Sequence, residues 1–189
     1  VGSTSSLVNL MVNLFFFLSV GTNVVAANYF GAGKKKELSD TVHTALLISF
    51  YSGIILTVFG IIGAKHILRF MQSPEQVLVK ATLYLQVYFA GITSTMIYNF
   101  GSALLRAKGD TKRPLYILFF AGIINVILNL IFVIFFHMDV AGVALATVIS
   151  QTISAILVIV CLIKEEDEFK LNMRKLKISL EAEKTALQL

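Results

Sequence analysis

The sequence predicts an all-α protein, a polytopic transmembrane helix bundle. Two observations carry this prediction. Of the 189 residues, 57% are hydrophobic and only 14% are charged, which is more apolar than a soluble domain of this length needs to be. The charged residues also avoid five long stretches, so that every Asp, Glu, Lys and Arg lies in the gaps between them. This composition excludes a disordered chain, because such chains lack the apolar residues to fold.

Each charge-free stretch is long enough to cross about 30 Å of hydrocarbon as a helix, which takes about 20 residues. The first stretch has no preceding basic segment and no initiator Met, which is not typical of a signal peptide. We therefore expect the chain to begin inside a longer protein. The five predicted helices span residues 5–30, 43–64, 81–105, 114–136 and 140–163.

Local signals mark where these helices begin and end. Glycine supplies the left-handed turn of a helix C-cap, so Gly31–Gly33 ends the first helix. Ser73 followed by Pro74 is a typical N-terminal signal for the third helix. The Gly109–Asp110 pair reverses the chain before Pro114 begins the fourth helix. The small residues of 140–147 predict that the fifth helix packs closely against a neighbour.

The basic residues predict the orientation of the bundle. Thirteen of the sixteen Lys and Arg residues lie in 34–40, 106–113 and 164–184, whereas 65–80 holds the other three. Loops rich in Lys and Arg stay in the cytoplasm, so the first helix should run inward and the C-terminal tail should be cytoplasmic. We expect a multi-pass protein of the cell (inner) membrane, with the lipid bilayer as its surroundings.

The same pattern excludes other classes of function. A net charge of +5 would suit a nucleic-acid binder only if the basic residues covered a folded face, so we expect no nucleic-acid partner. Paired membrane carboxylates, Cys/His clusters with metal-ligand spacing and a nucleophile elbow are all missing from the sequence. The protein is therefore expected to be neither an enzyme nor the carrier of a resident cofactor.

Uncharged polar residues inside the predicted helices are the best candidates for function, because such groups are costly in lipid unless they find partners. Asn125 and Asn129 lie four residues apart and so share a helix face. A tight hairpin would place Asn129 and Thr147 at similar depth, with Asn125 one turn deeper and Asn99 deeper still. Four further asparagines in the first helix, Asn9, Asn13, Asn23 and Asn28, suggest a helix that faces a cavity. The alternative is simple interhelical hydrogen bonding, worth about 0.6 to 2 kcal/mol for each residue.

Four stretches of the sequence, taken together, resemble one transporter family. They are residues 99–114, 124–129, 140–151, and 21–33 with 42–45. The sequence is similar in these places to the multidrug and toxic compound extrusion (MATE) transporters of the MOP flippase superfamily. The resemblance implies a twelve-helix fold in two lobes that exports cationic or amphipathic small molecules in exchange for Na⁺ or H⁺.

The resemblance also implies an assignment of the chain to one part of that fold. The five helices would correspond to helices 2–6, so residues 1–163 would form a partial N-terminal lobe. Residues 164–189 would then be a cytoplasmic amphipathic linker toward the C-terminal lobe. The alternative is an amphipathic segment that lies on the inner face of the membrane. The first helix and the C-terminal lobe, both outside this sequence, would be the partners of these helices within one longer chain.

The family's cation site can be placed on this sequence by motif. In members with a site in this lobe, an Asp of the first helix works with an Asn of the fifth, and with a backbone carbonyl and a Thr of the sixth. These last three positions match Asn125, Val143 and Thr147, which we expect to bind Na⁺, since hard cations prefer oxygen ligands. Asn99 matches another polar position of the pocket, and Asn129 stands where some members carry Asp.

Two other functions fit the sequence less well. A lipid-linked oligosaccharide flippase of the same superfamily would carry cationic residues within its membrane cavity, and the charge-free stretches here have none. A non-transporting membrane scaffold subunit would need no polar cavity at all.

Overall fold

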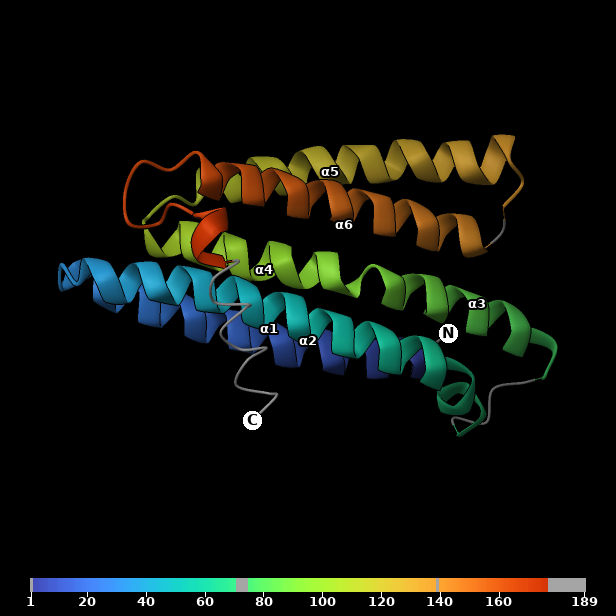
Figure 1. Ribbon diagram of the computed structural model, residues 1–189. Coiled ribbons are helices and arrows are strands. Elements are labelled where there is room, and N and C mark those ends of the chain that lie inside the picture. Colours follow the sequence, from blue (N-terminus) through green and yellow to red (C-terminus); the bar gives the residue numbers. More distant parts are fainter. Residues whose placement is uncertain (1, 71–74, 139, 177–189) are drawn as a thin grey trace.

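A computed structural model describes residues 2–70, 75–138 and 140–176, and every regular element among them is a helix (Figure 1). This confirms the predicted all-α helix bundle. The predicted N-cap at Ser73 lies outside the described residues. The elements are α1 (Gly2–Gly31), α2 (Lys35–Phe70), α3 (Glu75–Ala90), α4 (Ile92–Ala107), α5 (Lys112–Leu130), the π-helical turn η1 (Ile131–Phe135) and α6 (Val140–Ile163).

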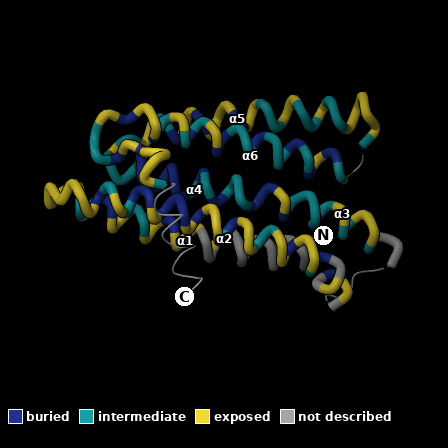
Figure 2. Tube along the Cα trace, viewed as in Figure 1, coloured by how far each residue is buried: buried dark blue, intermediate teal, exposed yellow. Residues whose placement is uncertain are grey.

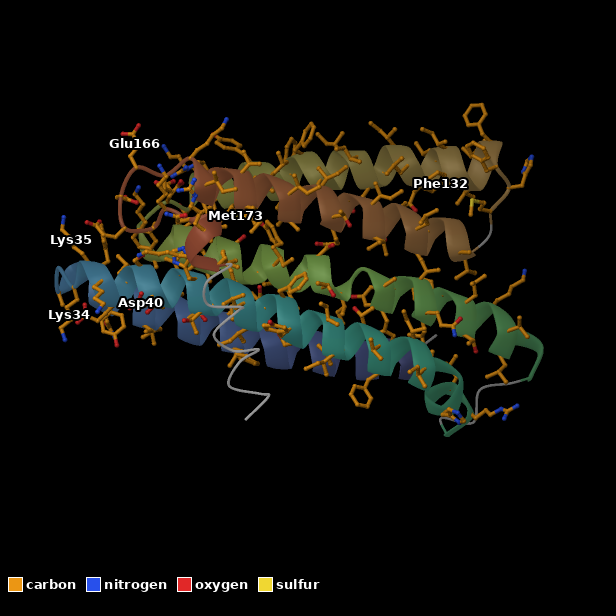
Figure 3. The ribbon with its side chains drawn as sticks, viewed as in Figure 1. Lys34, Lys35, Asp40, Phe132, Glu166 and Met173 are labelled. Carbon is orange, nitrogen blue, oxygen red and sulfur yellow. The ribbon has the colours of Figure 1, made fainter. Side chains whose placement is uncertain are left out.

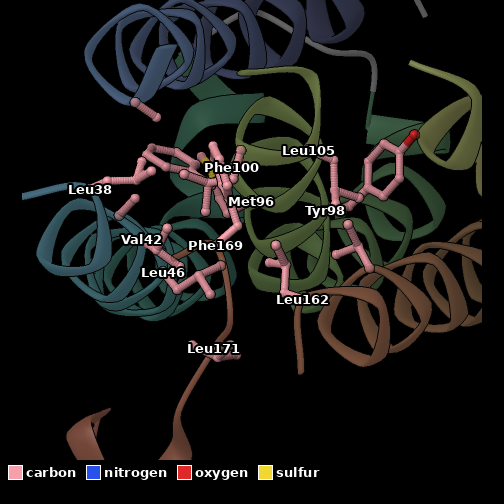
Figure 4. Packing of buried hydrophobic residues seen from close by; sticks show 14 of the residues in the cluster. Leu38, Val42, Leu46, Met96, Tyr98, Phe100, Leu105, Leu162, Phe169 and Leu171 are labelled. Atoms are coloured by element: carbon pink, nitrogen blue, oxygen red, sulfur yellow. The ribbon is translucent and has the colours of Figure 1, made fainter. Parts of the chain in front are cut away.

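The helices form three layers, with α1 and α2 on one side, α3 and α4 in the middle, and α5 and α6 on the other side (Figure 1). Helix α4 is central because it packs against α1, α2 and α6. Its buried side chains include Met96, Phe100 and Leu104, which belong to the largest apolar cluster of the described residues. Figure 4 shows Met96 and Phe100 in this cluster.

Many large hydrophobic side chains are exposed on the outside of the bundle, as expected of a protein surrounded by lipid. Figure 2 shows that exposed residues occur along the helices of all three layers. Only 11% of the apolar window of 112–135 is buried within the protein, and Leu115, Phe119 and Val126 all point outward. By length and composition, three helical stretches in the described part of the chain could cross a membrane: Lys35–Ala64, Lys112–Phe135 and Val140–Ile163.

The helix predicted over 81–105 is interrupted at Gly91, so that it forms the two collinear helices α3 and α4. The backbone N–H of Gly91 bonds to the carbonyl of Tyr88 at 3.0 Å, which is a tighter turn than that of an α-helix. The hydroxyl of Thr57 on α2 donates to the carbonyl of Phe89 at 2.9 Å. A neighbouring helix therefore supplies a partner for the backbone at the interruption, as a membrane interior requires.

The helix predicted over 114–136 also changes its geometry before it ends. After Leu130 the chain continues as the π-turn η1, whose wider hydrogen-bond ring closes from the N–H of Phe136 to the carbonyl of Ile131 at 3.3 Å. His137 then adopts a positive φ of 49°, and α6 begins at Val140. The predicted tight hairpin between the last two helices is confirmed, because α5 and α6 pack along their lengths.

Glycines form the two sharp turns at the other end of the bundle, as predicted. Gly33 has φ +67° between α1 and α2, and Gly109 has φ +92° between α4 and α5. These turns and residues 164–176 lie at one end of the bundle, which we call the basic end. Figure 3 shows Lys34, Lys35 and Glu166 at this end and Phe132 at the opposite one.

Close contact between α2 and α4 gives a testable consequence. A Cβ added to Gly53 would lie 2.7 Å from the backbone Cα of Thr93, which cannot move aside as a side-chain tip could. We predict that Gly53→Ala destabilises the protein by about 1 to 3 kcal/mol, as overpacking does. Thermal unfolding in detergent, followed by circular dichroism, measures the change.

The matched control is Gly122→Ala on α5, where an added Cβ meets no atom within 4 Å. Equal stability losses in the two variants would contradict the close packing of α2 on α4.

Candidate functional site

A cluster of uncharged polar side chains joins α5 to α6 within the span of the bundle. Asn125 Nδ2 donates to Thr147 Oγ1 and to Ser150 Oγ, both at 3.3 Å. Asn129 Nδ2 donates to Asn125 Oδ1 at 3.0 Å. Thr147 Oγ1 in turn donates to the backbone carbonyl of Val143 at 3.0 Å. Four of the five predicted site residues are therefore connected by one chain of hydrogen bonds.

The spacing of these residues explains how the sequence builds the cluster. Residues four apart lie on one face of a helix, so Asn125 and Asn129 lie one turn apart on the same face of α5, and Val143 and Thr147 one turn apart on the same face of α6. The antiparallel hairpin then brings the two faces together. We call these residues, together with Ser150, the α5–α6 cluster.

The register of the hairpin is close to the one expected from sequence. Counting residues from the helix ends pairs Asn129 with Thr147, and therefore places Asn125 near Gln151. Asn125 bonds to Ser150, the neighbour of Gln151, and also to Thr147 one turn away. The amide of Asn125 thus lies between these two hydroxyls.

One oxygen in the cluster has no hydrogen-bond partner. Asn129 Oδ1 is buried and accepts no hydrogen bond, although buried polar atoms normally have at least one partner. Both hydrogens of the Asn125 amide are used, on Thr147 and Ser150. The cluster therefore contains one amide oxygen, Asn129 Oδ1, without a hydrogen-bond partner.

The chemistry of the cluster is that of neutral oxygen donors. Such oxygens suit a hard cation or a polar ligand, and they provide no group that releases or takes up a proton near neutral pH. In residues 2–70, 75–138 and 140–176, no group of three or more His, Cys, Asp or Glu residues is placed to hold a metal ion.

Asn99, the fifth predicted site residue, does not join the cluster. It lies half-buried on α4, a helix that packs against α6 far more than against α5. Within the described chain, no hydrogen bond links Asn99 to the α5–α6 cluster. Ser150 belongs to the α5–α6 cluster but was not predicted from the sequence as a site residue. Its position three residues after Thr147 was the available signal, since residues i and i+3 share a helix face.

The asparagines of α1 have different surroundings. Asn23 Nδ2 donates to the carbonyl of Ala103 on α4 at 2.8 Å, which is a structural contact between helices. Asn13 and Asn28 are exposed, and the side chain of Asn9 lies outside the described residues. An open groove of about 550 Å³ lies between α1 and α2, but its lining includes none of these asparagines.

Comparisons with known proteins place the chain among membrane transporters. The model of the MatE family matches residues 1–131. The "probable multidrug resistance protein YpnP" of Bacillus subtilis (strain 168) is 30% identical over 151 residues, which are 80% of this chain and 34% of that protein. The chain spans about a third of the length of the curated relatives that it matches.

Solved structures of two conformations resemble this chain equally well. An inward-facing multidrug resistance MATE family transporter of the MOP superfamily matches with a TM-score of 0.80 at 24% identity, covering 86% of this chain and 37% of that one. An outward-facing transporter of the same description matches with a TM-score of 0.79 at 25% identity, covering 85% and 36%. The shared fold is therefore recognisable in both conformations.

The hydrogen bonds of the cluster predict an energetic coupling between its members. In a double-mutant cycle of Asn125→Ala and Thr147→Val, we expect a coupling energy of about 0.6 to 1.7 kcal/mol, the range of interhelical hydrogen bonds in membranes. Unfolding of the protein by denaturant in micelles measures it. Pairing Asn125→Ala instead with Thr152→Val, which removes a hydroxyl bonded to Ser94, should give almost no coupling. Equal coupling in the two cycles would contradict the hydrogen bond.

Proposed function

Because the chain belongs to the MATE family, we propose that it forms part of a membrane transporter that exports cationic or amphipathic drug-like molecules in exchange for Na⁺ or H⁺. The family match and the relative described as a probable multidrug resistance protein support drug efflux. The observation that carries the proposal on this chain's own residues is the α5–α6 cluster, with its orphan oxygen at Asn129.

We assign a coupling-cation site to Asn125, the carbonyl of Val143 and Thr147. The Thr147 hydroxyl lies within hydrogen-bonding distance of Asn125 Nδ2 and of the Val143 carbonyl. Because Asn125 faces Thr147 with its amide nitrogen, binding of an ion would require this amide to turn and present Oδ1, which in the structure accepts from Asn129. The donor set fits Na⁺, which takes oxygen ligands. Asn129 Oδ1 is the oxygen best placed to gain from a bound cation or substrate, because it lacks a partner.

Coupling to either ion also requires a negative charge that the cluster lacks. The resemblance to the family supplies a candidate, an Asp on a first helix that this sequence does not contain. A C-terminal lobe in the same longer chain is the other candidate. We therefore propose that the cluster binds the cation jointly with a carboxylate from another helix of the transporter.

Transport would proceed by alternating access, in which one lobe rocks against the other around a central cavity. The similar likeness of this chain to inward-facing and outward-facing transporters supports a bundle that moves as one body. A bound cation would favour one facing state to the extent that it binds that state more tightly.

We place the basic end of the bundle on the cytoplasmic side of the cell membrane. Its turns and the helix starts next to them carry Lys34, Lys36 and Lys112, all exposed. Positively charged loops stay in the cytoplasm. The opposite end carries the exposed aromatic Phe136 and a turn of only a few residues.

The site assignment predicts the effect of two substitutions in the intact transporter. Asn125→Ala and Thr147→Val should each lower ion-dependent ethidium efflux roughly tenfold or more, because loss of one ligating or orienting group costs about 10- to 100-fold in metal affinity. Thr152→Val is the control, since its hydroxyl bonds to Ser94 outside the cluster. Unchanged efflux and ion dependence in both variants would refute the site.

The orientation predicts which cysteines react from outside the cell. In a background that replaces Cys161 by serine, Phe136→Cys should react with an impermeant maleimide on intact cells. Lys112→Cys, at the basic end, should react only after the cells are permeabilised. The reverse pattern of labelling would contradict the proposed topology.

A further inference from the structure

Residues 164–176 fold back over the basic end of the bundle, and we call them the strap. Phe169 is fully buried, and its ring lies 5.3 Å from that of Phe30 at the end of α1. Leu171 is 3% exposed, and its N–H bonds to the carbonyl of Leu162 at 2.9 Å. Figure 4 shows Phe169 among the core side chains of α2 and α4.

Ion pairs hold the first half of the strap to three other elements. Lys35 Nζ of α2 lies 2.8 Å from Glu168 Oε1. Lys108, after α4, pairs with Glu165 and Asp167, and Arg113 of α5 also pairs with Glu165. These contacts connect the acidic run of the strap to the basic turns of the bundle.

The ion pair between Lys35 and Glu168 persists over a wide range of pH. The hydrogen bond from Lys35 holds the pKa of Glu168 below its usual value. A carboxylate with a lowered pKa loses its contribution only when the pH falls below its usual value of about 4. The Lys35–Glu168 pair therefore stays charged from neutral pH down to about that value. Burial opposes the charge of Lys108, but hydrogen bonds to Asp167 and Glu165 outweigh it and raise the pKa of the ammonium.

His43 of α2 makes a different contact with the second half of the strap. Its side chain is almost fully buried, with 5% of the residue exposed. His43 Nδ1 lies 2.6 Å from the carbonyl of Ser39, and the N–H of Asn172 donates to His43 Nε2 at 3.0 Å. A carbonyl can only accept, so the proton is on Nδ1, and Nε2 can receive the Asn172 N–H only while the ring is neutral.

Protonation of the His43 ring would break the hydrogen bond from Asn172, because Nε2 would become a donor. A proton on Nε2 would face the N–H of Asn172, which leaves two donors together and no acceptor. An unsatisfied buried donor costs about 1 to 3 kcal/mol, and more when it is charged. Lys175 Nζ donates to Ser39 Oγ at 3.3 Å, which adds a positive charge near the ring and does not supply an acceptor for Nε2.

Other charged and titratable groups lie on each element around His43, and their signs are mixed. Histidine is the side chain whose ordinary titration falls between about pH 5 and 8, whereas carboxylates titrate lower and Tyr, Lys and Arg higher. The groups are Tyr29 of α1, Lys34 of the turn, Lys35, Lys36, Glu37 and Asp40 of α2, Arg106 and Lys108 of the α4 end, and Lys164, Glu165, Glu166, Asp167, Glu168, Lys170, Arg174 and Lys175 of the strap.

We propose that the strap is a pH-sensitive latch, which His43 keeps seated while its imidazole is neutral and releases when the imidazole is protonated. Release would free the second half of the strap first, because the Lys35–Glu168 pair of the first half remains charged. The consequence for transport rests on the proposed function: acid at the basic end would loosen the tie between the bundle and the chain after Leu176. The latch itself is a property of the contacts and does not depend on that function.

A spin label on the strap tests the latch in the intact transporter. Met173, 60% exposed, is replaced by cysteine in a background whose native cysteines, including Cys161, are serine. The labelled protein in lipid nanodiscs should give an immobilised spectrum at pH 8 and a predominantly mobile one at pH 5. The same label at Lys112→Cys, outside the strap, should not respond.

Two substitutions of His43 identify the group that titrates. His43→Gln stays neutral and retains an oxygen that can accept from Asn172, so the pH response should disappear. His43→Ala has no acceptor, so the label on Met173→Cys should be mobile at every pH. Glu168→Gln, which weakens only the Lys35 pair, should keep the wild-type midpoint.

Three results would overturn the latch. They are an unchanged spectrum from pH 8 to 5, a transition that His43→Gln retains, and a transition only near pH 4, where carboxylates titrate. An efflux assay without activity would count against the proposed function and would leave these spectra unaffected.

Discussion

The structure depends on one constraint, which is that each backbone or side-chain polar group buried in an apolar bundle needs a partner within the protein. At Gly91 the middle layer interrupts its helix, and the hydroxyl of Thr57 on the neighbouring α2 takes the carbonyl of Phe89. Between α5 and α6 the same constraint aligns Asn125 with Thr147 and Ser150. Polar residues thus determine which helices pack together and in what register.

This constraint also favours the α5–α6 cluster as the site of cation binding. The cluster satisfies almost all of its donors and acceptors internally, so the bundle is stable without a ligand. The exception is Asn129 Oδ1. A site that nearly satisfies itself can exchange its internal hydrogen bonds for a bound ion at small cost, and such a balance suits a transporter that must bind its coupling ion and then release it.

Much of this arrangement could be predicted from the sequence, because charge-free runs and residue spacing follow from simple geometry. The helix bundle, the turns at Gly33 and Gly109, the α5–α6 hairpin and the shared face of Asn125 and Asn129 were all predictable in this way. The interruption at Gly91 was not, because it depends on a contact with Thr57 that lies far away in the sequence. The π-turn η1 was not predictable either, since no residue pattern marked it. The burial of Phe169 against α1, α2 and α4 required the packed structure itself.

The central claim is that this bundle belongs to an ion-coupled drug exporter. The most direct measurement is ethidium efflux from drug-sensitive cells that express the intact transporter, with Na⁺ present or absent and with the proton gradient intact or collapsed. We expect ethidium efflux that stops when one of these two ion gradients is removed. Absence of efflux under every condition, despite confirmed insertion in the membrane, would contradict it.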